Sequence, residues 1–280
     1  MLGYRHAFHA GNHADIFKHF ILYHTLKYLV QKDVPLLYVD THAGAGIYSL
    51  NSGYAAQNEE WQSGYQKLSS YSEPLPESIQ SFRSFLLSQT QSESLIYPGS
   101  PFIADRLLRD RDRRVFFELH SADYETLKKV FEQKKQISIF HSDGFTALRG
   151  LLPPTSRRAC VFMDPSYELA TDYERTLESI TEGLRRFPSG TYLIWYPLLS
   201  RKEAQKLPQT LLSLYQGNRC FAEIQVQEAT PRGMFGSGMV ILNPPWILQT
   251  IFQETLYQIT QILTEEAHKI HGRYCFQFFP

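Results

Sequence analysis

The stretch LLYVDTHAGAG, residues 36–46, decides how we interpret this sequence. Its first half, residues 36–40, is a short apolar run that ends in an acid, which is typical of a buried strand in a parallel sheet. Its second half contains two glycines in G-x-G spacing, which lets the backbone turn tightly and approach a ligand closely. In an open α/β sheet, ligands bind where such strands end. The stretch therefore predicts an α/β fold with a ligand site beside residues 40–46.

Apolar runs and helical patterns alternate along most of the remaining chain. Strands are expected at residues 115–119, 137–140, 159–163, 191–196, 221–226 and 239–242, and helices at 15–31, 124–133, 173–187 and 202–215. This alternation predicts a mostly parallel sheet with helices on both faces. Seven strands, with no long helix between the last two, suit the Rossmann-like sheet of class I S-adenosylmethionine-dependent methyltransferases, in which the last strand runs antiparallel. Dehydrogenases share the general layout, so the fold alone does not define the chemistry.

Residues 47–94 have a different composition, because Ser, Gln and Glu dominate and two prolines interrupt the segment. Amphipathic helices are expected around 59–68 and 77–87. We therefore predict a small helical insertion subdomain at 47–94, and a methyltransferase core made of residues 1–46 and 95–280.

Composition narrows the class of protein. The 28 basic and 28 acidic residues balance, so an RNA-binding role requires basic residues that are locally concentrated. The three cysteines (Cys160, Cys220 and Cys275) are scattered, which argues against disulfides or a zinc site and fits a reducing cytoplasm. No apolar run approaches the roughly 20 residues of a membrane span. We expect a cytoplasmic monomer with neither membrane nor metal as a partner.

Acidic residues at three strand ends, beginning with Asp40 of the first strand, predict the cofactor. The G-x-G turn, with Gly44 as its first glycine, has Ser49 where the dinucleotide-binding fingerprint needs a third glycine. Glu118 closes the second strand, where a carboxylate suits ribose hydroxyls, and Asp143-Gly144 follow the third, where Asp suits an adenine amino group. Singly, each acid is equally explained as a helix cap. Together they favour S-adenosylmethionine.

The fourth strand ends in Asp164-Pro165-Ser166-Tyr167, which resembles the [DNS]-P-P-[YFW] motif of amino-group methyltransferases. The amino nitrogen of adenine is a poor nucleophile because its lone pair is delocalised. The Asp164 carboxylate and the Pro165 carbonyl could each accept one N–H and stabilise developing positive charge. Asp164 could then take the released proton, and Tyr167 could stack on the base. Ser166 replaces the usual proline, which loosens the loop.

Residues 243–246, with the sequence NPPW, match this tetrapeptide better than residues 164–167 do. They follow the final strand, which is antiparallel in the expected fold, so they should lie at the opposite edge of the sheet. We therefore predict that Asp164, not Asn243, is catalytic.

The N-terminal segment is rich in histidine but has no standard zinc spacing. A lid over the cofactor is favoured, with Lys18 and His19 against the methionine carboxylate at a helix start.

Ser100, after the insertion, could supply another polar contact to the cofactor. Basic residues concentrate at 106–114, 128–135, 157–158 and 185–186, although such a run is more often a solvated helix face than a track for phosphates.

Several motifs together resemble one family. They are YRHxFHAGNHADxxKH, THAGAG, YPGSP, DG, DPxY, WYP, RGM and NPPW. Through them the chain resembles the bacterial 23S ribosomal RNA adenine-N6-methyltransferase family over nearly its whole length. The resemblance implies cofactor contacts at His19, His42, Ser100, Glu118, Asp143, Gly144 and Asp164. It also implies that Asp164 accepts the proton, that Tyr4 and His6 meet the RNA, and that 23S ribosomal RNA is the partner.

Two other functions stay open on the sequence. A DNA adenine-N6-methyltransferase would share the tetrapeptide chemistry, although its recognition insertion should be more basic than residues 47–94. A catalytically weakened, RNA-binding ribosome assembly factor would fit the replacement at Ser166.

Overall fold

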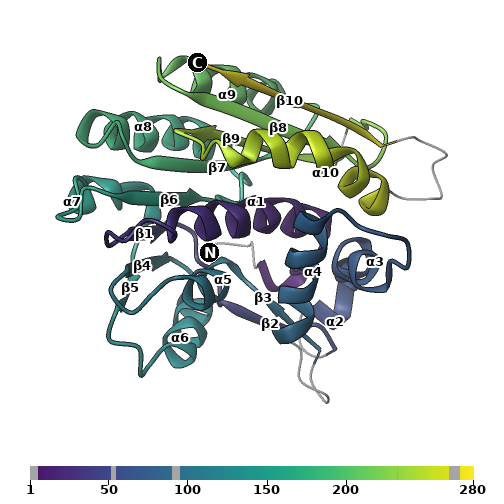
Figure 1. Cartoon of the computed structure of the whole chain (residues 1–280), viewed down its shortest axis with the longest axis horizontal. Coiled ribbons are helices and arrows are strands. Elements are labelled where there is room, and N and C mark those ends of the chain that lie inside the picture. The colour runs from purple at the N-terminus through teal and green to yellow at the C-terminus, as the bar shows by residue number, and fades with distance from the viewer. Residues whose placement is uncertain (1–5, 52–54, 90–94, 232, 265–271) are drawn as a thin grey trace.

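The computed structural model describes residues 6–51, 55–89, 95–231, 233–264 and 272–280. Its central sheet has eight strands in the order β10-β8-β9-β7-β6-β1-β4-β5 (Figure 1). Their bounds are Leu37–Asp40 (β1), Arg113–Glu118 (β4), Ile137–His141 (β5), Ala159–Met163 (β6), Thr191–Leu198 (β7), Arg219–Gln225 (β8), Gly236–Leu242 (β9) and Arg273–Phe279 (β10).

The predicted parallel sheet is confirmed. Strand β1 is parallel to both neighbours, and Val39 is in register with Val115 of β4 and Val161 of β6. All residues of β1 and β6 are buried, because helices cover both faces of the sheet. Strand β9 lies antiparallel between β7 and β8, as the class I methyltransferase fold requires.

The sheet has one strand more than the seven expected. Strand β10 pairs antiparallel with β8 at the edge of the sheet, and most of its side chains are partly or fully exposed. Phe276 and Phe278 pack against Phe252 of the preceding helix. Five of its seven residues are aromatic or apolar, which favours a strand, but no strand was predicted there.

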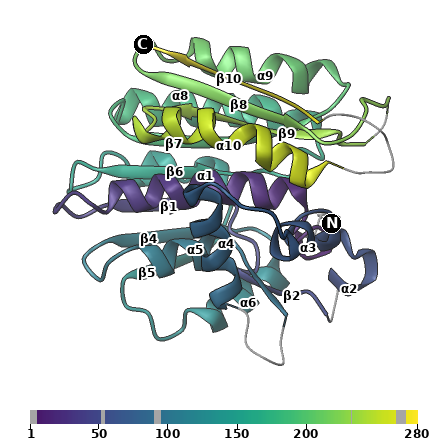
Figure 2. The same cartoon turned by 45° about the vertical axis from the view of Figure 1, so that its right-hand side comes forward.

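Helices cover the two faces of the sheet (Figures 1 and 2). One face carries α1 (His13–Leu29), α5 (Ser100–Leu107) and α10 (Ile247–Leu263), and the other carries α8 (Ala170–Arg186) and α9 (Lys202–Ser213). Two short helices, α6 (Ser121–Val130) and α7 (Leu148–Leu151), flank β5 along the chain. No helix among the described residues is long and apolar enough to cross a membrane.

The segment after β1 forms a smaller unit. Strands β2 (Ile47–Ser49) and β3 (Ile96–Pro98) pair antiparallel, and α2 (Ala55–Asn58), α3 (Tyr65–Ser70) and α4 (Glu77–Gln89) lie between them along the chain (Figure 1). The helix expected at 59–68 is broken into a 3-10 turn, Glu60–Ser63, followed by α3. Gly64 explains the break, because a Cβ there would lie 2.3 Å from the Asn12 carbonyl carbon. The division of the chain into two domains stays a prediction.

The two ends of the parallel strands carry different kinds of side chains. We call the end where β1, β4, β5 and β6 finish the carboxyl edge, and the end where they start the amino edge. The side chains predicted to bind or react follow the strands, and several basic segments precede them. Parallel pairing therefore brings each set to its own edge.

Candidate active site

A pocket opens at the carboxyl edge. Most of the residues that the sequence predicted for the cofactor and for catalysis line it: His6, His19, His42, Gly44, Ser100, Glu118, Asp143, Gly144, Asp164 and Pro165. They come from segments far apart in the chain: the ends of β1, β4, β5 and β6 supply most of them, and His6, His19 and Ser100 come from the N-terminal turn, α1 and α5.

The turn after β1 forms the floor beside Glu118. Gly44 has a φ of 61°, and a Cβ on it would lie 2.1 Å from the Tyr48 hydroxyl, so only glycine fits. The Gly44 N–H donates to Glu118 Oε2 at 2.7 Å, and the His120 N–H donates to Oε1 at 2.6 Å. Burial raises the pKa of Glu118, while these two N–H groups oppose the rise. The carboxylate is thus held in one orientation with acceptor capacity left for a ligand's hydroxyls.

The loop after β5 presents a second carboxylate. Asp143 caps the following 3-10 turn, accepting the Phe145 N–H at 3.1 Å, and its other oxygen pairs with Arg175 of α8. The Arg175 guanidinium also lies over the Phe145 ring, 4.3 Å from its centroid. Gly144 is required here, because a Cβ would lie 1.7 Å from the Thr41 carbonyl oxygen. Close packing between this loop and the β1 turn therefore fixes where Asp143 points.

Asp164, after β6, belongs to a buried chain of charges. Lys18 of α1 places its Nζ 2.6 Å from Asp164 Oδ2 and 2.8 Å from Asp15 Oδ1. Asp15 also accepts from the Gly11 N–H and lies 3.1 Å from His6 Nε2. Burial raises the pKa of Asp164, and the Lys18 ammonium opposes part of that rise. Asp164 is thus a carboxylate with increased basicity that faces the pocket.

Two pocket histidines are neutral. His19 is buried, its Nδ1 lies 2.8 Å from the Tyr97 hydroxyl, and burial lowers its pKa to about 3. His42 lies edge-on to Phe145, and burial lowers its pKa to about 4. Neutral imidazoles act here as hydrogen-bonding groups and not as cations.

The structure corrects two predicted roles. Lys18 lies in the second turn of α1 and is not among the described pocket-lining residues, because its ammonium bridges Asp15 and Asp164. Tyr167 offers no exposed face for a base: it is 2% exposed, and its hydroxyl donates to the Trp195 carbonyl at 2.8 Å. Its φ of 52° turns the side chain back into the core. Tyr4 lies outside the described residues.

Residues 243–246 lie at the amino edge, because Leu242 of the antiparallel β9 pairs with Tyr192 near the start of β7. The Asn243 side chain is used within the protein. It accepts from the Tyr215 hydroxyl at 2.7 Å and donates to the carbonyls of Pro188 and Gly190 at 2.6 and 2.8 Å. Asn243 therefore stabilises a turn, and it lies at the edge opposite the pocket, as its place after β9 predicted.

Sequence reasoning missed two groups in or behind the pocket, and it gave the strand-ending acid Asp40 no specific role. Arg175 lies within an ordinary amphipathic helix, so no motif identifies it. Asp15 resembles a helix cap in the sequence, but its carboxylate joins Lys18 to His6. Asp40 ends β1 completely buried beside the Tyr38 hydroxyl, and burial raises its pKa to about 7. Only its position as the strand-ending acid gave a signal.

The sheet order, the antiparallel β9 and carboxylates held at successive strand ends define a class I S-adenosylmethionine-dependent methyltransferase. The residues fit the cofactor, because glycines at 44 and 144 keep the backbone close to the pocket and Glu118 and Asp143 are already oriented by backbone N–H groups.

The chain belongs to the family described as "Ribosomal RNA large subunit methyltransferase D, RlmJ", whose model matches residues 33–274. It is 39% identical over 272 residues to "Ribosomal RNA large subunit methyltransferase J" of Haemophilus influenzae, covering 95% of this chain and 96% of the relative. It is also 39% identical over 253 residues to the protein of that name from Escherichia coli, covering 89% of each. A crystal structure of a Legionella pneumophila protein superposes with a TM-score of 0.87 at 31% identity, covering 96% of this chain and 98% of that one.

Proposed function

We propose that this protein transfers a methyl group from S-adenosylmethionine to the exocyclic N6 of one adenosine in 23S ribosomal RNA. The relatives' names point to large-subunit ribosomal RNA as the substrate. The position of Asp164 supports the chemistry: a buried carboxylate, paired with Lys18, at the end of β6 in a pocket that also holds Glu118 and Asp143.

The bound cofactor supplies an electrophilic methyl group. Glu118 would accept the ribose hydroxyls and Asp143 the adenine amino group, while His19, His42, Ser100 and the Gly44 and Gly144 backbones would complete the binding surface. All of these residues line the pocket. Arg175 and the Phe145 N–H hold the Asp143 carboxylate in place for this contact.

Asp164 and Pro165 would activate the target amine. Each accepts one N–H, which localises the nitrogen lone pair and stabilises the positive charge that develops during transfer. Asp164 then takes the proton, for which its raised pKa suits it. Lys18 positions Asp164, and Tyr167 anchors the loop through its bond to Trp195. His6 and Tyr4 would meet the RNA at the entrance.

The test is methyl transfer to unmodified large-subunit RNA, to duplex DNA and to a reaction without nucleic acid, followed by nucleoside analysis. N6-methyladenosine in the RNA alone is expected. Transfer to duplex DNA alone would make the protein a DNA methyltransferase, and RNA binding without transfer would make it an assembly factor. Mass spectrometry of large-subunit RNA from cells lacking the protein should then show the loss of one N6-methyladenosine.

A further inference from the structure

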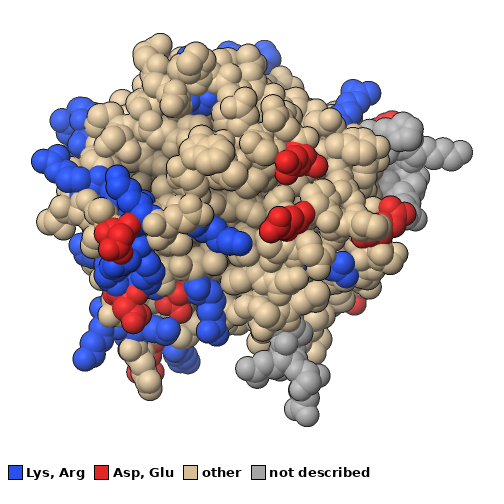
Figure 3. Space-filling view, in the orientation of Figure 1, with Lys and Arg blue, Asp and Glu red and all other residues tan. Residues whose placement is uncertain are grey.

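Exposed basic side chains gather at the amino edge, on the far side of the sheet from the pocket. They lie in the segments that lead into β1, β4, β5 and β6, and parallel pairing brings these segments together. Figure 3 shows Lys and Arg along the left flank, where these segments lie in Figure 1. We call this set the basic edge: Lys32, Arg111, Arg113, Lys134, Lys135 and Arg157.

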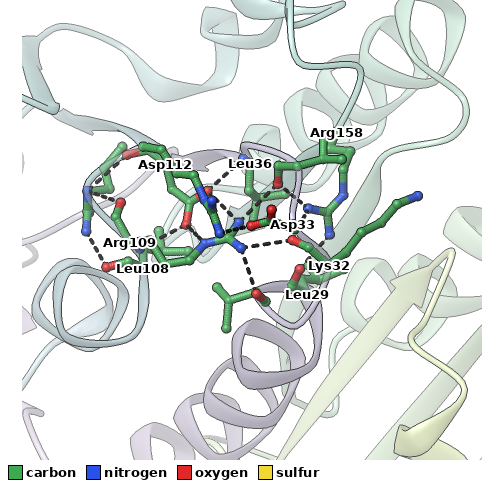
Figure 4. Close-up of polar contacts among 12 residues, drawn as sticks. Leu29, Lys32, Asp33, Leu36, Leu108, Arg109, Asp112 and Arg158 are labelled. Atoms are coloured by element: carbon green, nitrogen blue, oxygen red, sulfur yellow. Dashed lines mark hydrogen bonds and ion pairs between the residues drawn. The ribbon is translucent and has the colours of Figure 1, made fainter.

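Two other arginines of this region serve the fold. The Arg158 guanidinium donates to the carbonyls of Leu29 and Val34 at 2.5 and 2.6 Å, and Arg109 is bonded to Asp112 and to loop carbonyls (Figure 4). These guanidiniums hold the end of α1 against the start of β1.

Several members of the basic edge are not used in this way. Arg111 pairs with Asp33, and Lys134 lies 3.2 Å from Asp105. The side chains of Lys32, Arg113 and Arg157 are exposed, and none makes an ion pair with another described residue. In Figure 4 the Lys32 side chain extends away from the arginine cluster. The basic edge therefore carries positive charge beyond what the fold uses.

A nucleic acid whose target base enters the pocket would find its phosphates attracted to the basic edge and not to the pocket. The chain as a whole carries a formal net charge of zero, and the pocket is lined by carboxylates that repel phosphate. Beside the basic edge, Trp246 is 67% exposed and meets the Tyr28 ring edge-on, with centroids 6.2 Å apart. An exposed indole next to basic side chains provides a stacking surface for a nucleic-acid base.

We propose that the basic edge binds the phosphate backbone of the RNA that flanks the methylated adenosine, an inference that rests on the proposed function. Strand β6 links the two ends, since Arg157 and Arg158 precede it and Asp164 follows it. At about 3.3 Å per residue, the ends are separated by roughly 20 Å. That straight line runs through the sheet, so the path that an RNA follows over the protein surface is longer still. An RNA must therefore extend well beyond the target to reach both sites.

The experiment compares two charge-reversed variants. Lys32→Glu/Arg157→Glu alters the basic edge, and Lys206→Glu/Arg273→Glu makes the same charge change at exposed sites on α9 and β10. The RNAs are a large-subunit fragment of at least about 40 nucleotides and a target oligonucleotide of about five, which carries little phosphate backbone beyond the target. Fluorescence anisotropy gives Kd at several salt concentrations, and methyl transfer gives KM and kcat.

The basic-edge variant should bind the long RNA roughly tenfold more weakly at about 0.1 M salt, and its salt slope should fall by about two. Its kcat, and its KM for the short RNA, should not change. Equal weakening by the control variant, or no weakening at all, would overturn the proposal. If the basic-edge variant melts early, Lys32→Gln/Arg157→Gln removes the same two phosphate contacts and should show about the same slope change. Failure of the wild type to methylate ribosomal RNA would instead refute the proposed function. The comparison of Kd values would still test the basic edge, because it does not depend on methyl transfer.

Discussion

The two ends of the parallel strands each hold a buried carboxylate paired with a cation, and the two carboxylates differ in basicity. At the amino edge, Asp112 accepts from the Arg109 side chain and from the backbone N–H groups of Arg109 and Leu36. Burial pushes its pKa upward, but these bonds hold it below its ordinary value. At the carboxyl edge, burial prevails over Lys18 and raises the pKa of Asp164.

The two edges also differ in how completely their charged groups are hydrogen-bonded within the protein. Arg109 satisfies its donors within the protein, since they bond both Asp112 oxygens and the carbonyls of Val30, Lys32 and Val34 (Figure 4). At the carboxyl edge, carboxylates keep acceptor capacity toward the pocket. A fully bonded ion pair adds stability, and a partly bonded one is available for chemistry.

The largest effect should come from Asp164→Ala, which removes the proton acceptor. We expect kcat for methyl transfer to fall by about 10²- to 10⁴-fold, with little change in melting temperature because Lys18 keeps Asp15 as its partner. Asn243→Ala, the matched change in the better tetrapeptide match, should lower the melting temperature and leave kcat intact. Full activity of Asp164→Ala would contradict a catalytic role for the carboxylate at the carboxyl edge.

The reverse pattern should appear at the amino edge. Arg109→Ala leaves Asp112 buried without its main cation, which should cost about 3–5 kcal/mol of unfolding free energy. Urea unfolding measures this cost, and kcat of the remaining folded enzyme should be unchanged. Arg111→Ala breaks only the exposed pair with Asp33 and should cost under about 1 kcal/mol. Similar losses from the two variants would contradict a structural role specific to Arg109.

Asp40 allows a test of pH dependence at the carboxyl edge. Its pKa is raised from 3.8 to about 7, so the folded protein keeps a proton that the unfolded chain has already lost. Its contribution to stability is therefore full below about pH 4 and is lost as the pH rises through 7. Asn does not titrate, so the unfolding free energy of Asp40→Asn should rise relative to that of the wild type between pH 4 and pH 8, by up to about 4 kcal/mol. Parallel stability curves for the two proteins would refute the shift.

Two glycines provide a further pair of variants with modest expected effects on stability. Gly144→Ala should cost about 1–3 kcal/mol and raise KM for S-adenosylmethionine, because its Cβ would displace the Thr41 carbonyl. Gly150→Ala in α7 meets nothing within 4 Å and should stabilise by up to about 1 kcal/mol. Calorimetry and initial rates measure both variants. A neutral Gly144→Ala would show that the β1 and β5 loops are not in close contact.

The sequence predicted the sheet well where strands are buried and poorly where they are exposed. Strand β6 has the predicted bounds, because a strand buried on both faces is a continuous apolar run. Strand β10 was missed although five of its seven residues are aromatic or apolar, because the expected seven-strand fold ends before it. Among site residues, those that directly follow a strand, such as Glu118 and Asp143, reached the pocket as predicted, since topology alone brings strand ends together.

The sequence by itself determined which residues end the strands, and hence which carboxylates meet at the pocket, because chain order and parallel pairing leave little freedom. Only the tertiary structure decided what surrounds each of them. It placed Lys18 on Asp164 and Arg175 on Asp143, turned Tyr167 into the core, and gathered basic segments at the opposite edge. The reason is physical: a side chain's charge state and partners depend on burial and on contacts between distant elements, which no local pattern encodes.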